Sequence, residues 1–357
     1  MKPVYKTKLF TVALSLAAIL PVVSVKAGNP DRAGQAGATE LLINPWARSS
    51  GWGGANSGSI QGLESQFLNV AGTAFTKKTE VLFSHTNFLQ GSGITLNAFG
   101  LTQKMGESGV LGISIVSMSF GDVAITTNDQ PEPSLGTYSP QYINLGISYA
   151  KTFSNAISGG FTLRIIDESI SNLNASGVAL DAGIQYTTGS NEDRDNIHLG
   201  IALRNVGTPL SFGGDGLSTR VNAPNTSQVY SLSVNQRVEG FEMPSLVNIG
   251  AAYDFELLKD HMLTLAGNFT SNSFTNDQFT AGLQYSFRKM FMLRGGFTYE
   301  DHLFDDNLRT TAYSGPSAGL TIEVPMGSTG KKFGVDYSYR ATNPWNGIHS
   351  FGFRFNL

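Results

Sequence analysis

The chain lacks cysteine, has few charged residues and contains no long apolar run after its first 27 residues. Without cysteine, disulfide frameworks, thiolate metal sites and cysteine nucleophiles are excluded. Charged residues make up 14% of the 357 residues, whereas soluble domains usually contain about 25%. A run of about 18 apolar residues, the minimum for a spanning helix, does not occur after residue 27, which excludes a helical membrane protein. A secreted protein or an outer-membrane protein remains.

Motifs of catalysis and metal binding are missing as well. The five histidines belong to no HExxH motif and to no cluster with metal-ligand spacing. No nucleophile elbow occurs, and the glycine-rich stretch 51–58 lacks both the preceding strand and the lysine of a phosphate-binding loop. The sequence therefore predicts no enzymatic activity, no cofactor and no metal site.

Residues 1–27 are predicted to be a cleaved secretory signal. They contain a basic start, an apolar run at 10–25, and the small residues Val25 and Ala27 at three and one positions before a cut. A membrane anchor is the alternative, but the apolar run is short for a spanning helix. Removal of the four lysines in this segment changes the net charge from −3 to −7, and such an acidic chain is a poor ligand for nucleic acid.

From residue 78 onward, apolar residues recur at every second position, which is the period of a β-strand. The alternating segments run over about 10–14 residues, longer than the usual soluble strand, and a tilted strand needs about 9–11 residues to cross a bilayer. Two segments show the pattern well: Ile197, Leu199, Ile201 and Leu203 share one face, as do Phe333, Val335, Tyr337 and Tyr339.

Fourteen alternating segments can be counted, and bacterial outer-membrane barrels have an even number of strands. The three longest connections, 122–139, 207–242 and 302–314, follow the third, seventh and eleventh segments, so all three lie at one end of the barrel, opposite short turns. The segments lie near 78–89, 92–104, 108–121, 140–153, 156–169, 176–188, 193–206, 243–257, 260–272, 276–288, 290–301, 315–325, 331–342 and 347–357.

The last nine residues, HSFGFRFNL, carry an aromatic stripe that continues to the end of the chain. If the last strand pairs with the first, the barrel has no open edge and the stripe faces lipid. The alternative is a two-sheet sandwich whose last strand faces a core. The stripe consists of Phe351, Phe353, Phe355 and Leu357, whereas Gly352, Arg354 and Asn356 are expected to face the lumen together with Asp336 and Arg340.

Residues 28–77 differ from the strands, because they are rich in Gly, Ala, Ser and Asn and show no alternation. The lumen of a fourteen-strand barrel is too wide for side chains alone to fill. We therefore expect this segment to be a plug, with a disordered periplasmic tail as the alternative. The sequence predicts an all-β fold, a 14-stranded antiparallel transmembrane β-barrel of the outer membrane formed by residues 78–357, with an N-terminal lumen plug and with both termini on the periplasmic side.

The longest loop, 207–242, combines flexible glycines with apolar residues, which suggests a contact surface for a partner outside the cell. A lid that packs over the lumen is the alternative. Trp345 occupies the tip of another outer loop, where it is either an interface anchor or an aromatic residue of the membrane boundary. The candidate partner-binding residues are Leu210, Phe212, Asp215, Tyr230, Phe241 and Trp345.

Several stretches resemble the PorV/PorQ family, whose barrels are similar to the FadL fatty-acid transporters. AGATELLINPWARSSGWGGA resembles the start of that family, and LNVAG (68–72) occupies the place of its Asn-Pro-Ala motif; Asn69 and Ala71 match, but Val70 replaces the proline. The C-terminal half is similar to the PorV branch in four stretches: HMLTLAGNFTSNSFTNDQF (261–279), MFMLRGGFTYE (290–300), TAYSGPSAGLTIEVP (311–325) and FGVDYSYRATNPWNGIHSFGFRFNL (333–357).

This resemblance implies a role in type IX secretion. Barrels of the family lie in the outer-membrane bilayer beside a very large translocon barrel of the SprA or Sov type. They bind secreted cargo by its C-terminal signal domain and deliver it to an attachment complex that contains the PorU sortase. The first hypothesis is therefore a cargo-binding shuttle without catalysis of its own, with a blocked lumen.

The second hypothesis is a FadL-like transporter of hydrophobic small molecules. It predicts an apolar pocket in the lumen and a lateral opening near a strand kink. The missing proline at position 70 and the polar lumen expected from Asp336, Arg340 and Arg354 favour the shuttle. An open porin is disfavoured by the expected plug.

Overall fold

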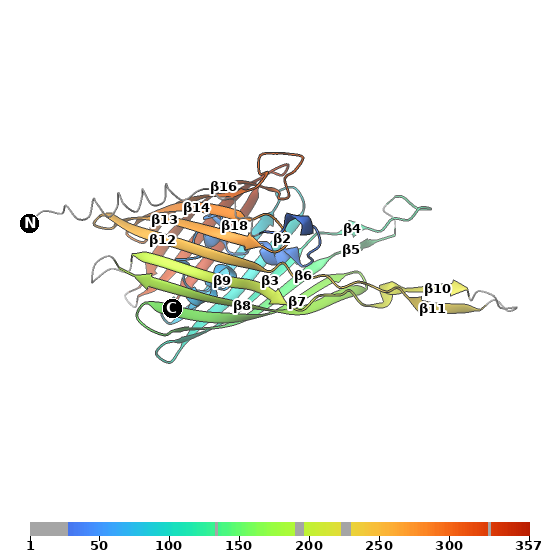
Figure 1. Ribbon diagram of the computed structural model, residues 1–357, viewed down its shortest axis with the longest axis horizontal. Coiled ribbons are helices and arrows are strands. Elements are labelled where there is room, and N and C mark those ends of the chain that lie inside the picture. The colour runs from blue at the N-terminus through green and yellow to red at the C-terminus, as the bar shows by residue number, and fades with distance from the viewer. Residues whose placement is uncertain (1–27, 133–134, 190–195, 223–229, 328–329) are drawn as a thin grey trace, which may run out of the picture.

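A computed structural model describes residues 28–132, 135–189, 196–222, 230–327 and 330–357. Fourteen long strands form one closed antiparallel barrel around a short, mostly helical N-terminal segment (Figure 1). The first strand pairs with the last in register from Glu80 and Asn356 to Asn87 and His349, so the barrel has no open edge. The predicted fold class is confirmed. The predicted signal at 1–27 lies outside the described residues.

The barrel strands follow the predicted order, each paired with its neighbours in the sequence. The largest difference from the predicted segments is at β9, expected from 193 and observed from Ile197. The strands are β1 (Thr79–Phe88), β2 (Ile94–Met105), β3 (Gly109–Ser119), β6 (Gln141–Thr152), β7 (Ile157–Ile170), β8 (Leu173–Thr188), β9 (Ile197–Gly207), β12 (Leu246–Leu258), β13 (His261–Asn272), β14 (Gln278–Phe287), β15 (Phe291–Glu300), β16 (Tyr313–Met326), β17 (Lys331–Thr342) and β18 (Ile348–Asn356).

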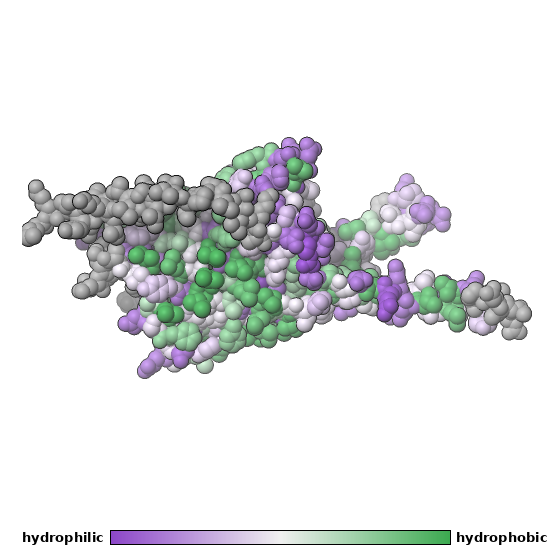
Figure 2. All heavy atoms as spheres, viewed as in Figure 1, coloured by the Kyte–Doolittle hydropathy of each residue, from purple (hydrophilic) through white to green (hydrophobic). Residues whose placement is uncertain are grey.

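The two faces of each strand differ in chemistry. In β18, Phe351, Phe353 and Phe355 are exposed on the outside, whereas Arg354 is buried in the lumen, as the terminal stripe predicts. The same alternation in the other strands gives the barrel an apolar outer band (Figure 2). Such a band fits the hydrocarbon core of an outer membrane. Among the described residues, no helix is long and apolar enough to cross a bilayer.

The two ends of the barrel are different. At the short-turn end, which we define by the connections 106–108, 153–156, 259–260 and 288–290, neighbouring strands are joined by a few residues. At the long-loop end, the connection from β3 to β6 contains β4 (Val123–Ala124) and β5 (Thr137–Tyr138), and the connection from β9 to β12 contains β10 (Ser218–Asn222) and β11 (Ser231–Asn235). These two hairpins, here called the arms, project well beyond the barrel (Figure 1).

The N-terminal segment, residues 28–78, crosses the lumen from one end to the other. Its short helices are η1 (Pro30–Arg32), η2 (Thr39–Leu42), α2 (Ala47–Ser50), α3 (Ser65–Leu68) and η3 (Val70–Phe75). The plug backbone lies so close to the wall that only glycine fits at some wall positions: a Cβ added at Gly250 would lie 2.7 Å from Gly58 N, and one at Gly296 would lie 2.2 Å from Trp52 O. Similar contacts occur on neighbouring strands, at Gly183, Gly200, Gly282 and Gly319.

The prediction that both termini lie on one side does not hold for the described chain. The backbone of Asn29 donates a hydrogen bond to Asn272 O at the long-loop end of β13, 3.3 Å away. Leu357 lies at the short-turn end, where its backbone donates to Thr79 O at 2.8 Å. A segment of this length can run through the whole lumen before β1 begins, so its two ends lie at opposite ends of the barrel.

Candidate functional site

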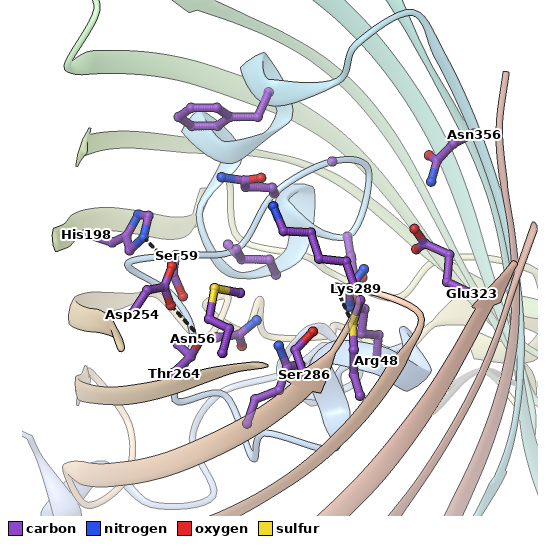
Figure 3. A pocket seen from close by; sticks show the side chains of 18 of the residues that line it. Arg48, Asn56, Ser59, His198, Asp254, Thr264, Ser286, Lys289, Glu323 and Asn356 are labelled. Atoms are coloured by element: carbon purple, nitrogen blue, oxygen red, sulfur yellow. Dashed lines mark hydrogen bonds and ion pairs between the residues drawn. The ribbon is translucent and has the colours of Figure 1, made fainter. Parts of the chain in front are cut away.

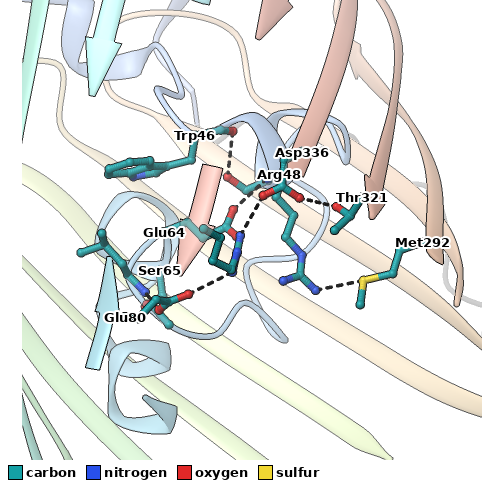
Figure 4. Close-up of polar contacts among 12 residues, drawn as sticks. Trp46, Arg48, Glu64, Ser65, Glu80, Met292, Thr321 and Asp336 are labelled. Carbon is teal, nitrogen blue, oxygen red and sulfur yellow. Dashed lines mark hydrogen bonds and ion pairs between the residues drawn. The ribbon is translucent and has the colours of Figure 1, made fainter. Parts of the chain in front are cut away.

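A buried ion cluster holds the plug to the wall beside the barrel seam between β18 and β1. The guanidinium of Arg354 in β18 contacts Glu64 of the plug, Glu80 of β1 at 3.0 Å and Asp336 of β17 at 3.4 Å, and all four side chains are buried. Figure 4 shows the three carboxylates converging from the plug and from two strands. Sequence analysis expected Asp336 and Arg354 in the lumen, and both lie there.

The carboxylates of this cluster also accept hydrogen bonds from groups other than Arg354. Glu64 accepts a hydrogen bond from the backbone of Ser49 at 2.9 Å, and Glu80 accepts one from the backbone of Leu63 at 2.7 Å. Asp336 accepts a hydrogen bond from the hydroxyl of Thr321. Buried charges are costly to leave unpaired, so this cluster fixes one position of the plug.

A second set of contacts runs from wall side chains to backbone carbonyls of the plug. Arg164 donates a hydrogen bond to Gln66 O at 2.6 Å while its Nε pairs with Asp181 at 2.6 Å. The carbonyls would otherwise be buried without donors, since the plug helices are only a few residues long. The same kind of contact joins Arg204 to Leu41, Gln185 to Ile60, Asn248 to Leu68, Arg294 to Arg48 and Thr298 to Gly53, at 3.0–3.4 Å.

The two residues matched to the family motif have structural roles in the plug. Asn69 accepts a hydrogen bond from the backbone of Ala71 at 3.2 Å, which caps η3, and donates one to Ile184 O of β8 at 3.1 Å. Ala71 is fully buried. Asn69 therefore shapes the turn and attaches it to the wall, and the replacement of proline by Val70 leaves this arrangement intact.

The half of the lumen near the long-loop end is filled by apolar side chains. Plug residues Trp46 and Phe67 pack in one cluster with wall residues Met118 and Ile166 and with loop residue Leu210. The cavity found there has a volume of only about 10 Å³. In the plug, burial raises the pKa of the Glu40 carboxyl above its ordinary value.

Three of the predicted partner-binding residues belong to this apolar cluster, which fills the lumen near the long-loop end. Leu210 has no exposed surface and pairs through its backbone with Phe241, at 2.9 and 2.8 Å. The rings of Phe212 and Phe241 lie 5.8 Å apart and pack against the same cluster. For Leu210, Phe212 and Phe241 the structure therefore matches the alternative, a lid over the lumen. A loop rich in apolar residues fits both a lid and a surface, and only the fold distinguishes them.

At the short-turn end the lumen widens into a vestibule of about 980 Å³ (Figure 3). Six basic and five acidic side chains line it, so its charges are nearly balanced. Glu64 and Glu80 of this lining pair with Arg354, Asp254 lies 3.1 Å from His198, and Glu323 lies 2.7 Å from Lys332. The vestibule is polar, and among the described residues no group of three or more His, Asp and Glu side chains is arranged to hold a metal ion.

The arm formed by β10 and β11 is exposed on both faces. Val221 pairs with Leu232 and Thr219 pairs with Val234, so these four side chains share one face, on which Tyr230 follows by its parity. Tyr230 is 50% exposed and Leu232 is 45% exposed. The other face is polar and includes Arg220 and Ser233.

The remaining predicted partner residues lie on the surface. Asp215 begins the short helix η4 (Asp215–Leu217) below the β10–β11 arm and is exposed. Trp345 is 40% exposed in the connection from β17 to β18. The predicted site is therefore divided: Tyr230, Asp215 and Trp345 are accessible to a partner, whereas Leu210 is not.

No protein-family model matches the chain, and no curated protein sequence matches it. Solved structures of similar fold do exist. The toluene transporter TodX of Pseudomonas putida matches with a TM-score of 0.54 at 12% identity, over 88% of this chain and 97% of that one. The toluene transporter TbuX of Ralstonia pickettii gives 0.53 at 10% identity, over 88% and 98%, and the CymD monoaromatic hydrocarbon channel gives 0.51 at 12%, over 88% and 97%.

These comparisons establish the fold alone, a closed antiparallel β-barrel like that of the two toluene transporters. The named proteins are transporters and channels and not enzymes. The sequence reading missed one GxSxG pattern, because Gly315–Gly319 has the sequence GPSAG. This stretch lies within strand β16 and does not join a strand to a helix, as a nucleophile elbow does. The described residues thus place no catalytic elbow there.

Proposed function

We propose that this chain is a docking subunit of type IX secretion, which binds the C-terminal signal domain of secreted cargo beside an SprA/Sov-type translocon. It then carries the cargo to a PorU-type attachment complex. The observation that carries this proposal is the contrast between a lumen that is filled and fixed by its plug and two arms that present apolar side chains beyond the barrel. The resemblance to the PorV/PorQ family supplies the identity of the partners.

The filled lumen argues against a permanent passage through the barrel. The ion cluster around Arg354, the wall donors to plug carbonyls and the packed apolar half each oppose movement of the plug. A route through the barrel would have to break several of these contacts together, and removal of one partner from a buried ion pair costs about 3–5 kcal/mol.

The β10–β11 arm has the properties of a protein-binding element. A two-stranded hairpin by itself is marginally stable in water, because it has few neighbours and two open edges. A partner can add a strand to an edge while its apolar side chains cover Val221, Leu232 and Val234. In this proposal the long-loop end faces the outside of the cell, as long loops do in outer-membrane barrels.

A transporter of hydrophobic small molecules is the second candidate, and the names of the similar solved structures favour it over the first. The β15–β16 ladder is the place where such a molecule could leave sideways, because it ends at Phe297 and Pro316 and leaves the last three residues of β15 without partners on β16. This candidate requires the plug to move, since the described apolar half of the lumen holds no cavity of useful size.

The proposal is tested by affinity purification of the tagged full-length protein from gently solubilised outer membranes, in wild type and two variants. Val221→Ser/Leu232→Ser removes the apolar face of the arm, and Ser231→Ala/Ser233→Ala changes the polar face to the same extent. We expect the wild type and the polar-face variant to recover a very large barrel and secreted proteins that share one C-terminal domain, and the apolar-face variant to lose the secreted proteins. Recovery of the barrel alone with bound apolar small molecules in all three samples would support the transporter.

A further inference from the structure

Lysine is distributed unevenly in the described barrel. All eight lysines of the described residues lie at the short-turn end: Lys77, Lys78, Lys104, Lys151, Lys259, Lys289, Lys331 and Lys332. The basic residues of the long-loop end are arginines, such as Arg220, Arg309 and Arg340. A lysine has a long apolar stem and a strongly hydrated charge, so it suits the level of lipid headgroups beside an apolar wall.

Six of these lysines lie at the short-turn ends of neighbouring strands or just before β1, and they are here called the basic arc: Lys77, Lys78, Lys104, Lys151, Lys331 and Lys332. The strands β17, β18, β1, β2, β3 and β6 follow one another around the barrel.

Hydrogen bonds and strand register connect the members of the arc. The backbone of Lys104 donates to Lys78 O at 2.7 Å, and Lys332 lies opposite Asn356, which also lies opposite Glu80 of β1. Gly109 lies opposite both Met105 and Lys151, which brings the ends of β2 and β6 together.

Most of the arc has no counter-ion within the part of the chain that the structure describes. Lys332 pairs with Glu323 at 2.7 Å. Among the described residues, no carboxylate lies within ion-pair distance of the other five, and all five are exposed. Glu80, two residues from Lys78, is buried in the ion cluster, and Glu107, three residues from Lys104, lies in the turn between β2 and β3. Lys77, Lys78 and Lys332 line the vestibule, whereas Lys151 and Lys331 have the parity of the outward-facing residues of their strands. The positive charge of these two exposed lysines is available to an external anion.

Aromatic side chains lie next to both ends of the arc, on the outer face of the barrel. Beside Lys331 and Lys332, the ring of Phe333 lies 4.9 Å from that of Phe355 and 6.4 Å from that of Phe353. Beside Lys151, the rings of Tyr149 and Phe161 lie 6.2 Å apart, and Phe153 is 68% exposed. Charge above an aromatic girdle is the arrangement found where a barrel meets the headgroup layer.

We propose that the outward-facing lysines of the basic arc, Lys151 and Lys331, bind the phosphate headgroups of anionic phospholipids in the leaflet that surrounds the short-turn end. The apolar outer band continues directly to Lys331, so the acyl chains of a bound lipid would lie along Phe333, Phe355 and Val81 while its phosphate meets Lys331. This surface serves to anchor one side of the barrel seam to lipid, and it is independent of the function proposed for the arms.

The expected loss of lipid affinity follows from the number of lysines that are replaced. Each lysine close to an anionic membrane surface contributes about 1 kcal/mol, which is roughly a fivefold gain in affinity. Lys259 and Lys289 lie outside the arc, near Asp260 and Glu256, and Arg288 beside them already pairs with Asp260 at 3.7 Å. Replacing these two lysines changes the net charge equally but removes nothing from the arc, and it provides a matched control.

The test is native mass spectrometry of the full-length protein in detergent micelles, titrated with phosphatidylglycerol or with phosphatidylcholine. Lys151→Gln/Lys331→Gln is compared with Lys259→Gln/Lys289→Gln, and the shift between boiled and unboiled samples on gels shows that each barrel is folded. We expect the first variant to bind phosphatidylglycerol several-fold more weakly, up to about fivefold per lysine, with phosphatidylcholine binding unchanged and the control within about twofold of wild type.

Three outcomes would overturn the proposal. Equal losses in both variants would show that overall charge and not the arc attracts the lipid. Equal binding of the two lipids by the wild type would show that the arc does not select anionic headgroups. Complete displacement of phosphatidylglycerol by soluble glycerol phosphate would assign the lysines to a free phosphate and not to a lipid.

Discussion

The plug and the β10–β11 arm are both short segments without a core of their own, but they are supported in different ways. The plug is covered by the barrel wall, and wall side chains donate hydrogen bonds to seven of its described carbonyls while Arg354 pairs with its Glu64. The described residues of the arm make no such contacts with the barrel strands, and both of its faces are exposed. A segment whose polar groups are mostly paired inside one chain is part of the scaffold, whereas one with open edges and an apolar face is completed by another molecule.

The largest effect is expected when the central cation of the cluster that holds the plug, Arg354 of β18, is removed. Arg354→Ala leaves Glu64, Glu80 and Asp336 buried without their shared partner, so we expect a loss of about 3–5 kcal/mol in the free energy of unfolding. Urea unfolding followed by tryptophan fluorescence measures it. Arg288→Ala, an exposed arginine at the short-turn end, is the control. A loss below about 1 kcal/mol for Arg354→Ala, the range of a surface ion pair, would contradict the role of this cluster.

A larger side chain at a wall glycine tests whether the plug can be displaced while the barrel stays folded. The Cβ of Gly250→Val would lie 2.0 Å from Ser57 Oγ, whereas the nearest atom to a Cβ at Gly267 lies 3.8 Å away. We expect Gly250→Val to cost about 1–3 kcal/mol and to raise ion conductance in planar bilayers, because the plug is displaced. Gly267→Val should conduct as little as the wild type. Equal conductance of both variants would mean that the plug does not close the lumen.

A smaller loss in the free energy of unfolding is expected for Asn69→Ala, which removes the cap of η3 and the hydrogen bond to Ile184 O. Loss of such a cap costs about 0.5–2 kcal/mol. Ser59, a half-buried plug residue that lines the vestibule, gives a comparison when changed to Ala. If both substitutions have the same effect on urea unfolding, Asn69 does not attach the plug to β8.

The smallest effect on stability is expected in the arm. Val221→Ser/Leu232→Ser changes exposed side chains, and surface substitutions usually stay within about 0.5 kcal/mol. The same variant should lose recovery of secreted proteins in the purification described above. A large loss of stability would show that this face packs against the protein itself, and the arm would then belong to the scaffold like the plug.

The barrel could be predicted because its outer face is strictly periodic. Segments such as 333–339 alternate without interruption, and the stripe Phe351–Phe355 continues to the end of the chain, so strand number, closure and the side facing lipid followed from parity alone. Asp336 and Arg354 were predicted in the lumen for the same reason, and both are buried there.

The contacts that hold the plug could not be predicted in the same way. Glu80 has the parity of the lumen-facing positions of β1, and this was a signal for its role, but its partner Glu64 lies in a segment without periodicity. The direction of the plug depends on contacts such as Asn29 with Asn272, which join residues far apart in the sequence. The burial of Leu210 likewise depends on its pairing with Phe241 across the long loop.

The central claim is that the barrel works with its plug in place. Because the chain has no cysteine, a disulfide between Ser57→Cys in the plug and Asn268→Cys in β13, whose side chains are hydrogen-bonded to each other, can lock the plug without competing thiols. Export and surface attachment of a protein with a type IX C-terminal domain is then measured in cells under oxidising and reducing conditions. The account predicts wild-type export with the plug locked. Export that stops on oxidation and returns on reduction would contradict it, because the plug would then have to move for the protein to work.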